Sequence, residues 1–147
     1  ITTRLGFGKT DVIQMLNGAI GGLVAITAEP LMPTPLTAIL IGAAGGIIVV
    51  YGTKFLLLMK IDDVVGAIPA HLFAGIWGTL AVPITNSAAK FGTQLLGIIA
   101  INGTVFVISL IIWSIMKKSI GIRLSKEGEL KGTDATETGV IAYAIRD

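Results

Sequence analysis

The chain has no cysteine and only one histidine, His71, among its 147 residues. The absence of cysteine excludes disulfide bonds and thiolate metal sites. A single histidine excludes bis-histidine ligation of a haem within this chain. No apolar segment supplies a carboxylate that would complete a metal site around the histidine. We therefore expect neither a metal nor another cofactor.

Charged residues are also scarce. They make up 14% of the chain, against 53% for hydrophobic residues, whereas soluble domains carry about 25% charge. The 11 lysines and arginines occur singly or in pairs rather than in a stripe, which argues against a nucleic-acid partner. No Ser/His/Asp set and no pair of catalytic carboxylates is visible, so we do not expect an enzyme. The composition is that of a protein embedded in a lipid membrane.

Four long apolar segments account for most of the length. Each is close to the roughly 20 residues that a helix needs to cross a bilayer; they cover residues 12–28, 36–59, 64–83 and 92–116. The sequence therefore predicts an all-α, polytopic transmembrane helix bundle, with a membrane domain over residues 12–118. Closely spaced glycines in the first two segments would let helices approach each other in lipid. We expect residues 1–11 to form a loop and 119–147 a polar tail.

Basic residues gather beside one set of helix ends. Only Lys90 flanks the opposite ends, and the larger set consists of Arg4, Lys9, Lys54, Lys60, Lys117 and Lys118. The positive-inside rule places the larger set, and with it the tail, in the cytoplasm. We therefore expect a multi-pass protein of the cell membrane (inner or plasma membrane) with a cytoplasmic C-terminus.

His71 lies near the middle of the third expected span. Asp62 and Asp63 are followed by 20 residues without a charged side chain, and His71 lies about 12 Å beyond Asp63 on a helix. Pro69 removes a helical hydrogen bond at Val65 and should bend the span just before the histidine. An ionisable side chain at this depth is costly, which favours a functional role.

Two interpretations of His71 follow from the residues alone. A neutral imidazole would either hydrogen-bond an adjacent helix or line a path for a small polar solute or a proton. Its neighbours at helical spacing are mostly small, which predicts a narrow space beside the ring; they are Ala67, Ile68, Ala74, Gly75 and Gly78.

Four other polar residues also allow two interpretations each. Asp62 and Asp63 would cap the helix that follows them or form a vestibule that attracts cations. Asn17 and Thr27 lie in the first apolar segment. They would more often serve as hydrogen-bond partners between helices than as solute ligands.

Several motifs together resemble the ammonium transporter family (Amt/Mep, and distantly Rh). The likeness runs essentially from end to end, in the family's order. Its residues are Gly8-Lys9, Asn17-Gly18-Ala-Ile-x-Gly22-Leu-Val-Ala-Ile-Thr27, Asp62-Asp63-x2-Gly66-x2-Pro69-x-His71-x3-Gly75-Ile-Trp-Gly78-Thr, and in the tail Gly121-Ile-Arg123, Glu127-x-Glu129, Gly132-x-Asp134 and Thr138-Gly139-x2-Ala142-Tyr143.

The resemblance implies an eleven-span trimeric channel, of which this chain would supply the last four spans and the cytoplasmic tail. His71 matches the second of two pore histidines that face each other along a hydrophobic conduit. Ala67 matches a pore-lining apolar position, and Thr27 a position near the conduit. Asn17 is a candidate to support the pore histidine. Thr136 falls where some plant members carry a regulatory threonine.

Partners also follow from the resemblance. We expect ammonium or ammonia as the solute, two further copies in a homotrimer, the missing N-terminal half of the transporter, and in prokaryotes a PII-type signalling protein at the cytoplasmic face. The chain opens on Ile1 without an initiator methionine, which fits a piece of a longer transporter. Two other functions stay open: an ammonium-sensing membrane module coupled to a signalling output, and a purely structural four-helix subunit.

Overall fold

The computed structural model describes residues 1–141, which form helices, turns and loops without a strand. Ala142 and Tyr143, which belong to the tail motif, lie outside the described residues. The chain divides into two compact units, Ile1–Asn102 and Gly103–Asp147. The prediction of an all-α fold with membrane-spanning helices is confirmed.

Three helical segments are long and apolar enough to cross a membrane. They are α3 (Pro35–Leu58), the combined segment Ile68–Thr85, and α5 (Phe91–Ser119). The first expected span forms α2 (Val12–Ile26), an apolar helix of 15 residues. At 1.5 Å per residue it is about 22 Å long, somewhat short of a hydrocarbon core.

Residues 1–11, expected as a loop, contain the short helix α1 (Thr2–Phe7). Gly8 ends it with a φ of 73° and donates its main-chain N–H to the oxygen of Arg4. A residue in this left-handed conformation, most often glycine, is a common way for a helix to stop. Sequence periodicity alone does not reveal so short a helix, because six residues carry less than two turns of pattern.

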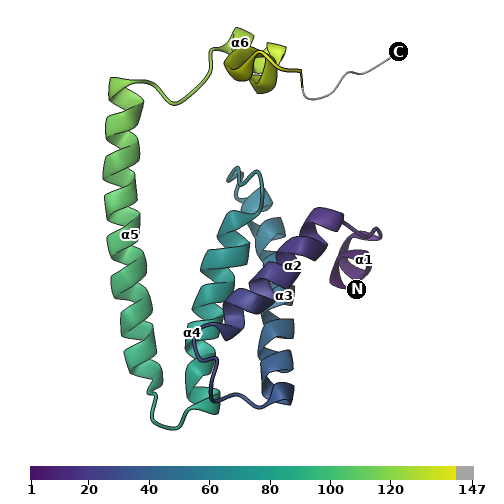
Figure 1. The fold of residues 1–147 in the computed structure, drawn as a ribbon, viewed down its shortest axis with the longest axis vertical. Helices are drawn as coiled ribbons and strands as arrows, with labels where there is room; N and C mark the ends of the chain where they lie inside the picture. Colours follow the sequence, from purple (N-terminus) through teal and green to yellow (C-terminus); the bar gives the residue numbers. More distant parts are fainter. Residues whose placement is uncertain (142–147) are drawn as a thin grey trace. The chain divides into compact units, whose positions relative to one another are not determined.

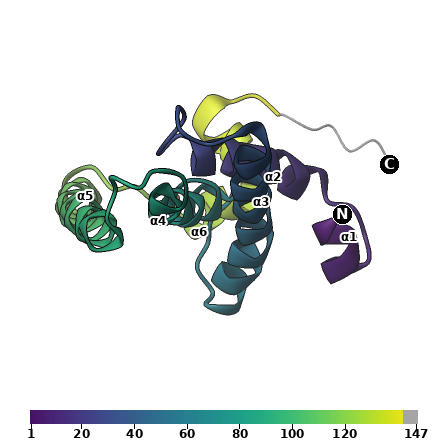
Figure 2. The ribbon, with the colours of Figure 1, turned by 90° about the horizontal axis from the view of Figure 1, so that it is seen from below.

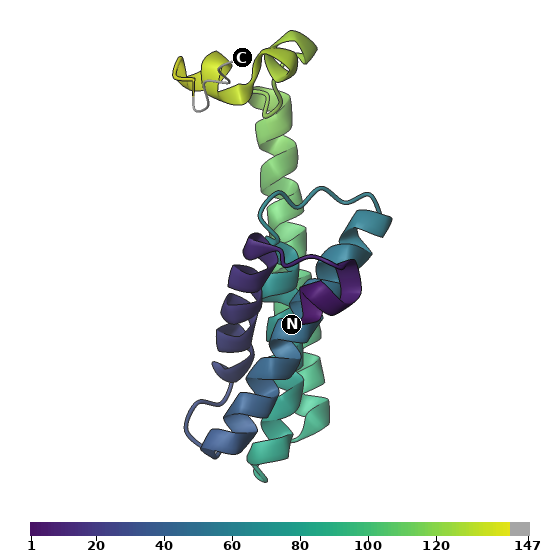
Figure 3. The same ribbon diagram turned by 90° about the vertical axis from the view of Figure 1, so that its right-hand side faces the viewer.

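Helices α2 and α3 lie side by side (Figures 1 and 3). Three glycines from each helix meet at the contact: a Cβ on Gly22 would lie 3.1 Å from the oxygen of Gly42, and one on Gly46 would lie 3.0 Å from that of Gly18. A Cβ on Gly45 would lie 2.8 Å from the oxygen of Gly21. The small faces predicted from the sequence therefore pack directly against each other.

The third span packs against both of these helices (Figure 2). It consists of η1 (Ile68–Phe73), a π-helix, continued by α4 (Ala74–Thr85). Two small buried clusters hold it in place, one around Val49, Ala70 and Ala74 and one around Ala25, Ile41 and Ala81. The indole N–H of Trp77 also donates to the main-chain oxygen of Ile41, at 3.0 Å.

The second unit contains the later part of α5 and two short helices of the tail. These are α6 (Lys126–Lys131) and the π-helix η2 (Asp134–Thr138). Arg123 donates to the carboxylate of Glu129 at 2.9 Å, and this hydrogen bond and charge raise the pKa of the exposed arginine above its usual value. Over its whole length α5 has no buried residue.

Candidate functional site

The turn that carries His71 is wider than an α-helical turn. Residues Ile68–Phe73 form a π-helix, in which hydrogen bonds run from i to i+5, a geometry often found at functional sites. Pro69, the second residue of this turn, has no N–H to donate to the oxygen of Val65. The helix begins only after Gly66, whose φ is 72°, so Pro69 lies in the first helical turn, where a missing N–H breaks no helical hydrogen bond. His71 therefore lies close to the start of the helix, and the prediction that it lies near the middle of the span is wrong. The sequence predicts a bend within a span that starts at residue 64, but neither the start of the helix at Ile68 nor the wide turn.

Asn17 donates a hydrogen bond to the turn that precedes this helix. Its side-chain Nδ2 lies 2.7 Å from the main-chain oxygen of Val65, and Asn17 is only 9% exposed. Gly66 passes close to the same amide in a left-handed conformation, with a φ of 72°. The structure therefore places Asn17 under the entrance to the π-helical turn rather than against the imidazole. If Asn17 supports His71, as predicted, it would do so through the backbone of this turn and not by a bond to the imidazole.

Asp63 accepts hydrogen bonds at the start of the same helix. Its two carboxylate oxygens accept the main-chain N–H groups of Ala67 and Ile68, each at 2.9 Å. The negative charge also faces the positive end of the helix dipole. Asp62 is exposed and takes no part in this arrangement. The geometry at Asp63 is that of a helix cap.

The side chain of His71 is exposed on the outer side of the helix and lines a groove of about 300 Å³. Gly75 and Thr79 lie on the same wall, and the Thr79 hydroxyl donates to the oxygen of Gly75 at 2.9 Å. The first turns of α5 supply the other wall, including Gln94 and Asn102. The groove thus combines an imidazole, a hydroxyl and two amides with an apolar remainder of Leu72, Ile76, Ile98 and Ile101.

Gln94 and Asn102 are the residues that the sequence analysis missed. They are polar side chains inside a long apolar segment, eight residues apart. Eight residues are slightly more than two α-helical turns, so both lie on one face. This spacing could have identified them.

The predicted small neighbours of His71 divide between two faces. Gly75 lines the groove with the histidine, whereas Ala74 and Gly78 are buried on the side that packs against α2 and α3. The prediction that all of them share one face is wrong for Ala74 and Gly78. It assumed α-helical periodicity through a turn that is π-helical.

Three other predicted site residues lie away from the groove. Ala67 is exposed one turn before His71, at the capped end of the helix. Thr27 is exposed at the end of α2, where its hydroxyl donates to the oxygen of Val24 at 2.7 Å. Thr136 belongs to the tail unit, where its hydroxyl donates to the oxygen of Gly128 at 3.2 Å.

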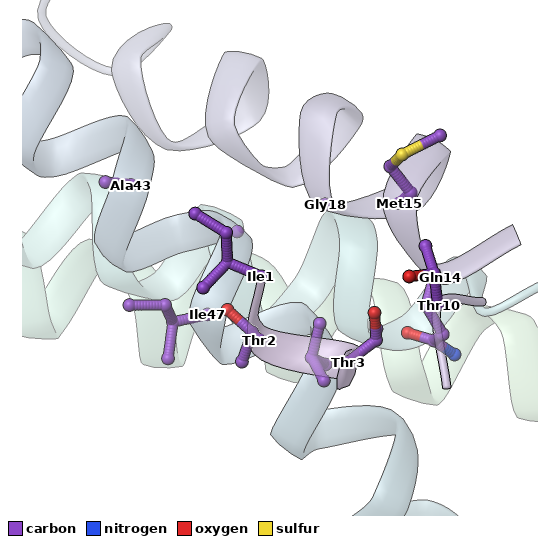
Figure 4. Close-up of a pocket in the computed structure, with 11 residues that line it drawn as sticks. Ile1, Thr2, Thr3, Thr10, Gln14, Met15, Gly18, Ala43 and Ile47 are labelled. Carbon is purple, nitrogen blue, oxygen red and sulfur yellow. The ribbon is translucent and has the colours of Figure 1, made fainter. Parts of the chain in front are cut away.

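A second cavity, of about 210 Å³, lies at the junction of α1, α2 and α3 (Figure 4). Thr2, Thr3 and Gln14 contribute polar atoms to it, and Met15 and Ile47 contribute apolar ones. Within residues 1–141, no group of three or more His, Asp and Glu side chains could hold a metal ion.

Comparisons with known proteins agree on one family. The model of the Ammonium Transporter Family matches residues 1–143. The chain is 38% identical to the ammonium transporter Amt2 of Archaeoglobus fulgidus, over 96% of this chain and 34% of that protein. It is 38% identical to a putative ammonium transporter of Synechocystis, over 89% of this chain and 30% of that protein.

A third relative has similar identity and coverage. The ammonium transporter Amt1 of Haloferax mediterranei is 36% identical over 92% of this chain and 27% of its own length. The chain therefore spans about a third of the length of the curated relatives it matches. No solved structure matches it.

Proposed function

Because the chain belongs to the ammonium transporter family, we propose that it forms the C-terminal part of a membrane channel for ammonium or ammonia. The observation that carries this proposal is the setting of His71. The imidazole is exposed on an otherwise apolar membrane helix and lines a groove with further polar side chains. It is the one ionisable side chain of that helix.

The physical chemistry of the solute supports a histidine in this position. Ammonium is charged and strongly hydrated, so moving it intact through an apolar conduit carries a large desolvation cost. Ammonia is small and neutral, and a neutral imidazole offers it one donor and one acceptor. We propose that His71 lines the conduit and that Ala67 forms part of its wall one turn away. Thr27 would lie near the conduit.

The rest of the proposed assembly rests on the resemblance to the family and on the length of the relatives. Since this chain corresponds to about a third of them, further spans would supply the facing side of the conduit, including a second histidine. We propose a homotrimer in the cell membrane with a cytoplasmic tail. A PII-type protein would bind near that tail.

Thr136 is the proposed point of regulation in the tail. Its hydroxyl donates to the oxygen of Gly128, and this bond links η2 to α6. A phosphate on Thr136 would remove the donor and add negative charge near Asp134 and Glu137. We expect Thr136→Asp to lower uptake, while Thr136→Val, which lacks the charge, lowers it less. Normal uptake by the aspartate variant would rule out the regulatory role.

The test of the main proposal uses the whole transporter that contains this chain. In proteoliposomes, His71→Ala and His71→Leu should change ammonium flux or the discrimination between ammonium and potassium, while the protein still inserts. Ile84→Ala, an exposed position on the same helix, serves as the control. Unchanged flux and discrimination in both histidine variants would contradict a pore role for His71.

A further inference from the structure

The four polar side chains of the His71 groove are spaced regularly on its two walls. One wall carries His71 and Thr79, and the other, formed by the first turns of α5, carries Gln94 and Asn102. The two polar residues of each wall are eight residues apart. All of them belong to the compact unit Ile1–Asn102. The polar spacing on one wall therefore repeats the spacing on the other.

These side chains pair at two depths. The two helical segments that form the walls are joined by the short connection 86–90. Measured along each segment from this connection, His71 and Asn102 lie about 20 and 16 Å away, at roughly 1.5 Å per residue. Thr79 and Gln94 lie only about 9 and 5 Å away by the same measure. His71 and Asn102 thus form an inner level of the groove, and Thr79 and Gln94 an outer level.

Apolar side chains separate the two levels. Ile76 supplies the apolar stretch on the wall of the histidine, and Ile98 and Ile101 supply it on α5. The groove has a volume of about 300 Å³, far more than the roughly 10–15 Å³ that a water-sized molecule needs. A small solute therefore fits between the walls and meets polar side chains only at the two levels.

The two amides on α5 are half-buried and free to bind a solute. Within residues 1–141, neither the Gln94 nor the Asn102 side chain takes part in a hydrogen bond. Asn102 lies well inside α5, which starts at Phe91, and an amide inside an apolar helix costs free energy unless it is hydrogen-bonded. Because Asn102 lines the groove, a molecule in the groove lies within its reach.

The atoms at each level suit a small solute that carries N–H donors. The Thr79 hydroxyl donates its hydrogen to the oxygen of Gly75, so toward a solute its oxygen can only accept. Each amide adds an acceptor oxygen, and a neutral imidazole adds an acceptor nitrogen. Two acceptors can bind the N–H groups of ammonia or ammonium. They are too few to replace the hydration shell of potassium, for which channels use rings of carbonyl oxygens.

We propose that Gln94 and Asn102 contact the transported solute, Asn102 together with His71 and Gln94 together with Thr79. The groove then has two hydrogen-bonding positions for ammonia or another small N–H donor, separated by an apolar stretch. The inference rests on the proposed role of His71 in the conduit. It extends that role to α5, a helix on which the sequence predicts no transport residue.

The test measures ammonium flux into proteoliposomes that contain the whole transporter, at low ammonium concentration. Asn102→Leu and Gln94→Leu should each lower the flux about five-fold, the effect of losing one ordinary hydrogen bond. Asn102→Gln keeps an amide and should lose less. Thr93→Val is the control and should leave the flux unchanged, because Thr93 is exposed beside Gln94 and is not among the residues that line the groove.

Double variants distinguish solute contact from a structural role. If Asn102 and His71 bind one solute molecule, Asn102→Leu combined with His71→Leu should lose less flux than the product of the two single losses. Gln94→Leu combined with Thr79→Val should behave in the same way. Asn102→Leu combined with Thr79→Val changes both levels, and there the losses should multiply.

Three results would overturn this proposal alone. Full flux in both leucine variants, with the flux altered in His71→Leu, would keep the conduit and exclude α5 from it. Losses that multiply within each level would mean that the paired side chains do not share a solute. A fall in the amount of folded protein that accounts for the lost flux would mean that the amides bind another helix. Unchanged flux in both His71 variants would instead contradict the conduit assignment, and this proposal with it.

Discussion

The side-chain amide of Asn17 donates a hydrogen bond of 2.7 Å to the main-chain oxygen of Val65, 48 residues away. Val65 lies in the turn before the helix, followed by Gly66 with a φ of 72°. A side chain from α2 thus satisfies a carbonyl in the turn that precedes the helix, which begins at Ile68. This bond connects α2 to the start of the helix that carries His71.

Replacing Asn17 with leucine should destabilise the protein by about 1–2 kcal/mol. The loss arises because a part-buried carbonyl loses its donor. The measurement is the free energy of unfolding in mixed detergent micelles. Asn102→Leu removes an equivalent amide from α5 and should have a smaller effect. An equal loss in both variants would mean that the bond to Val65 contributes nothing specific.

Asp63→Ala and Asp62→Ala should differ clearly in their effect on the free energy of unfolding. Asp63→Ala removes the acceptor of two main-chain N–H groups and should cost about 1–2 kcal/mol of unfolding free energy. Asp62→Ala should change stability by less than about 0.5 kcal/mol, since it is exposed. If instead both variants lowered ammonium flux at normal stability, the alternative role as a cation-attracting vestibule would be favoured.

The contact between α2 and α3 should not tolerate a methyl group at Gly45. A Cβ there would lie 2.7 Å from that of Ala25 and 2.8 Å from the oxygen of Gly21, so the helices must separate. We expect Gly45→Ala to destabilise the protein by about 1–3 kcal/mol. Gly103→Ala is the control, because nothing lies within 4 Å of its added Cβ; it should be neutral or slightly stabilising. Thermal unfolding in detergent distinguishes the two.

Lys60→Gly should stabilise the end of α3. Lys60 has a φ of 57°, which is strained for a residue with a Cβ, and relief of this strain should contribute about 0.5–1 kcal/mol. Gly121, with a φ of 74° just after α5, offers the reverse experiment: Gly121→Ala should lose a similar amount. A Lys60→Gly variant less stable than the wild type would show that the lysine side chain contributes more than the backbone strain costs.

The sequence predicts the helices well because hydropathy depends on each segment alone. The apolar runs, the prolines between α2 and α3 and the glycine faces all follow from local composition. The π-helical turn does not, because it is tied to contacts that arrive from elsewhere in the chain. Asp63 closes its start and Asn17 comes from α2. Pro69 predicts a disturbance, but only the packed partners determine its form.

The groove beside His71 is predicted in part for a related reason. A lone histidine within an apolar run is visible at once, whereas its neighbours depend on the helical period on either side. The assumed α-helical period correctly groups Gly75 with the histidine but wrongly adds Ala74 and Gly78. Gln94 lies on α5, and a single sequence does not show that α5 lines the same groove as the helix of His71.

The third span consists of the wide turn at Ile68–Phe73 and the α-helix that follows it, and the two parts have separate constraints. After it, Ala74 and Gly78 must stay small, because they pack against α2 and α3. His71 lies within the turn itself and faces outward. The buried positions of α4 therefore lie after the turn, and the histidine lies within it. Substitution of the histidine should therefore change the groove while the packing of α4 on α2 and α3 stays as it is.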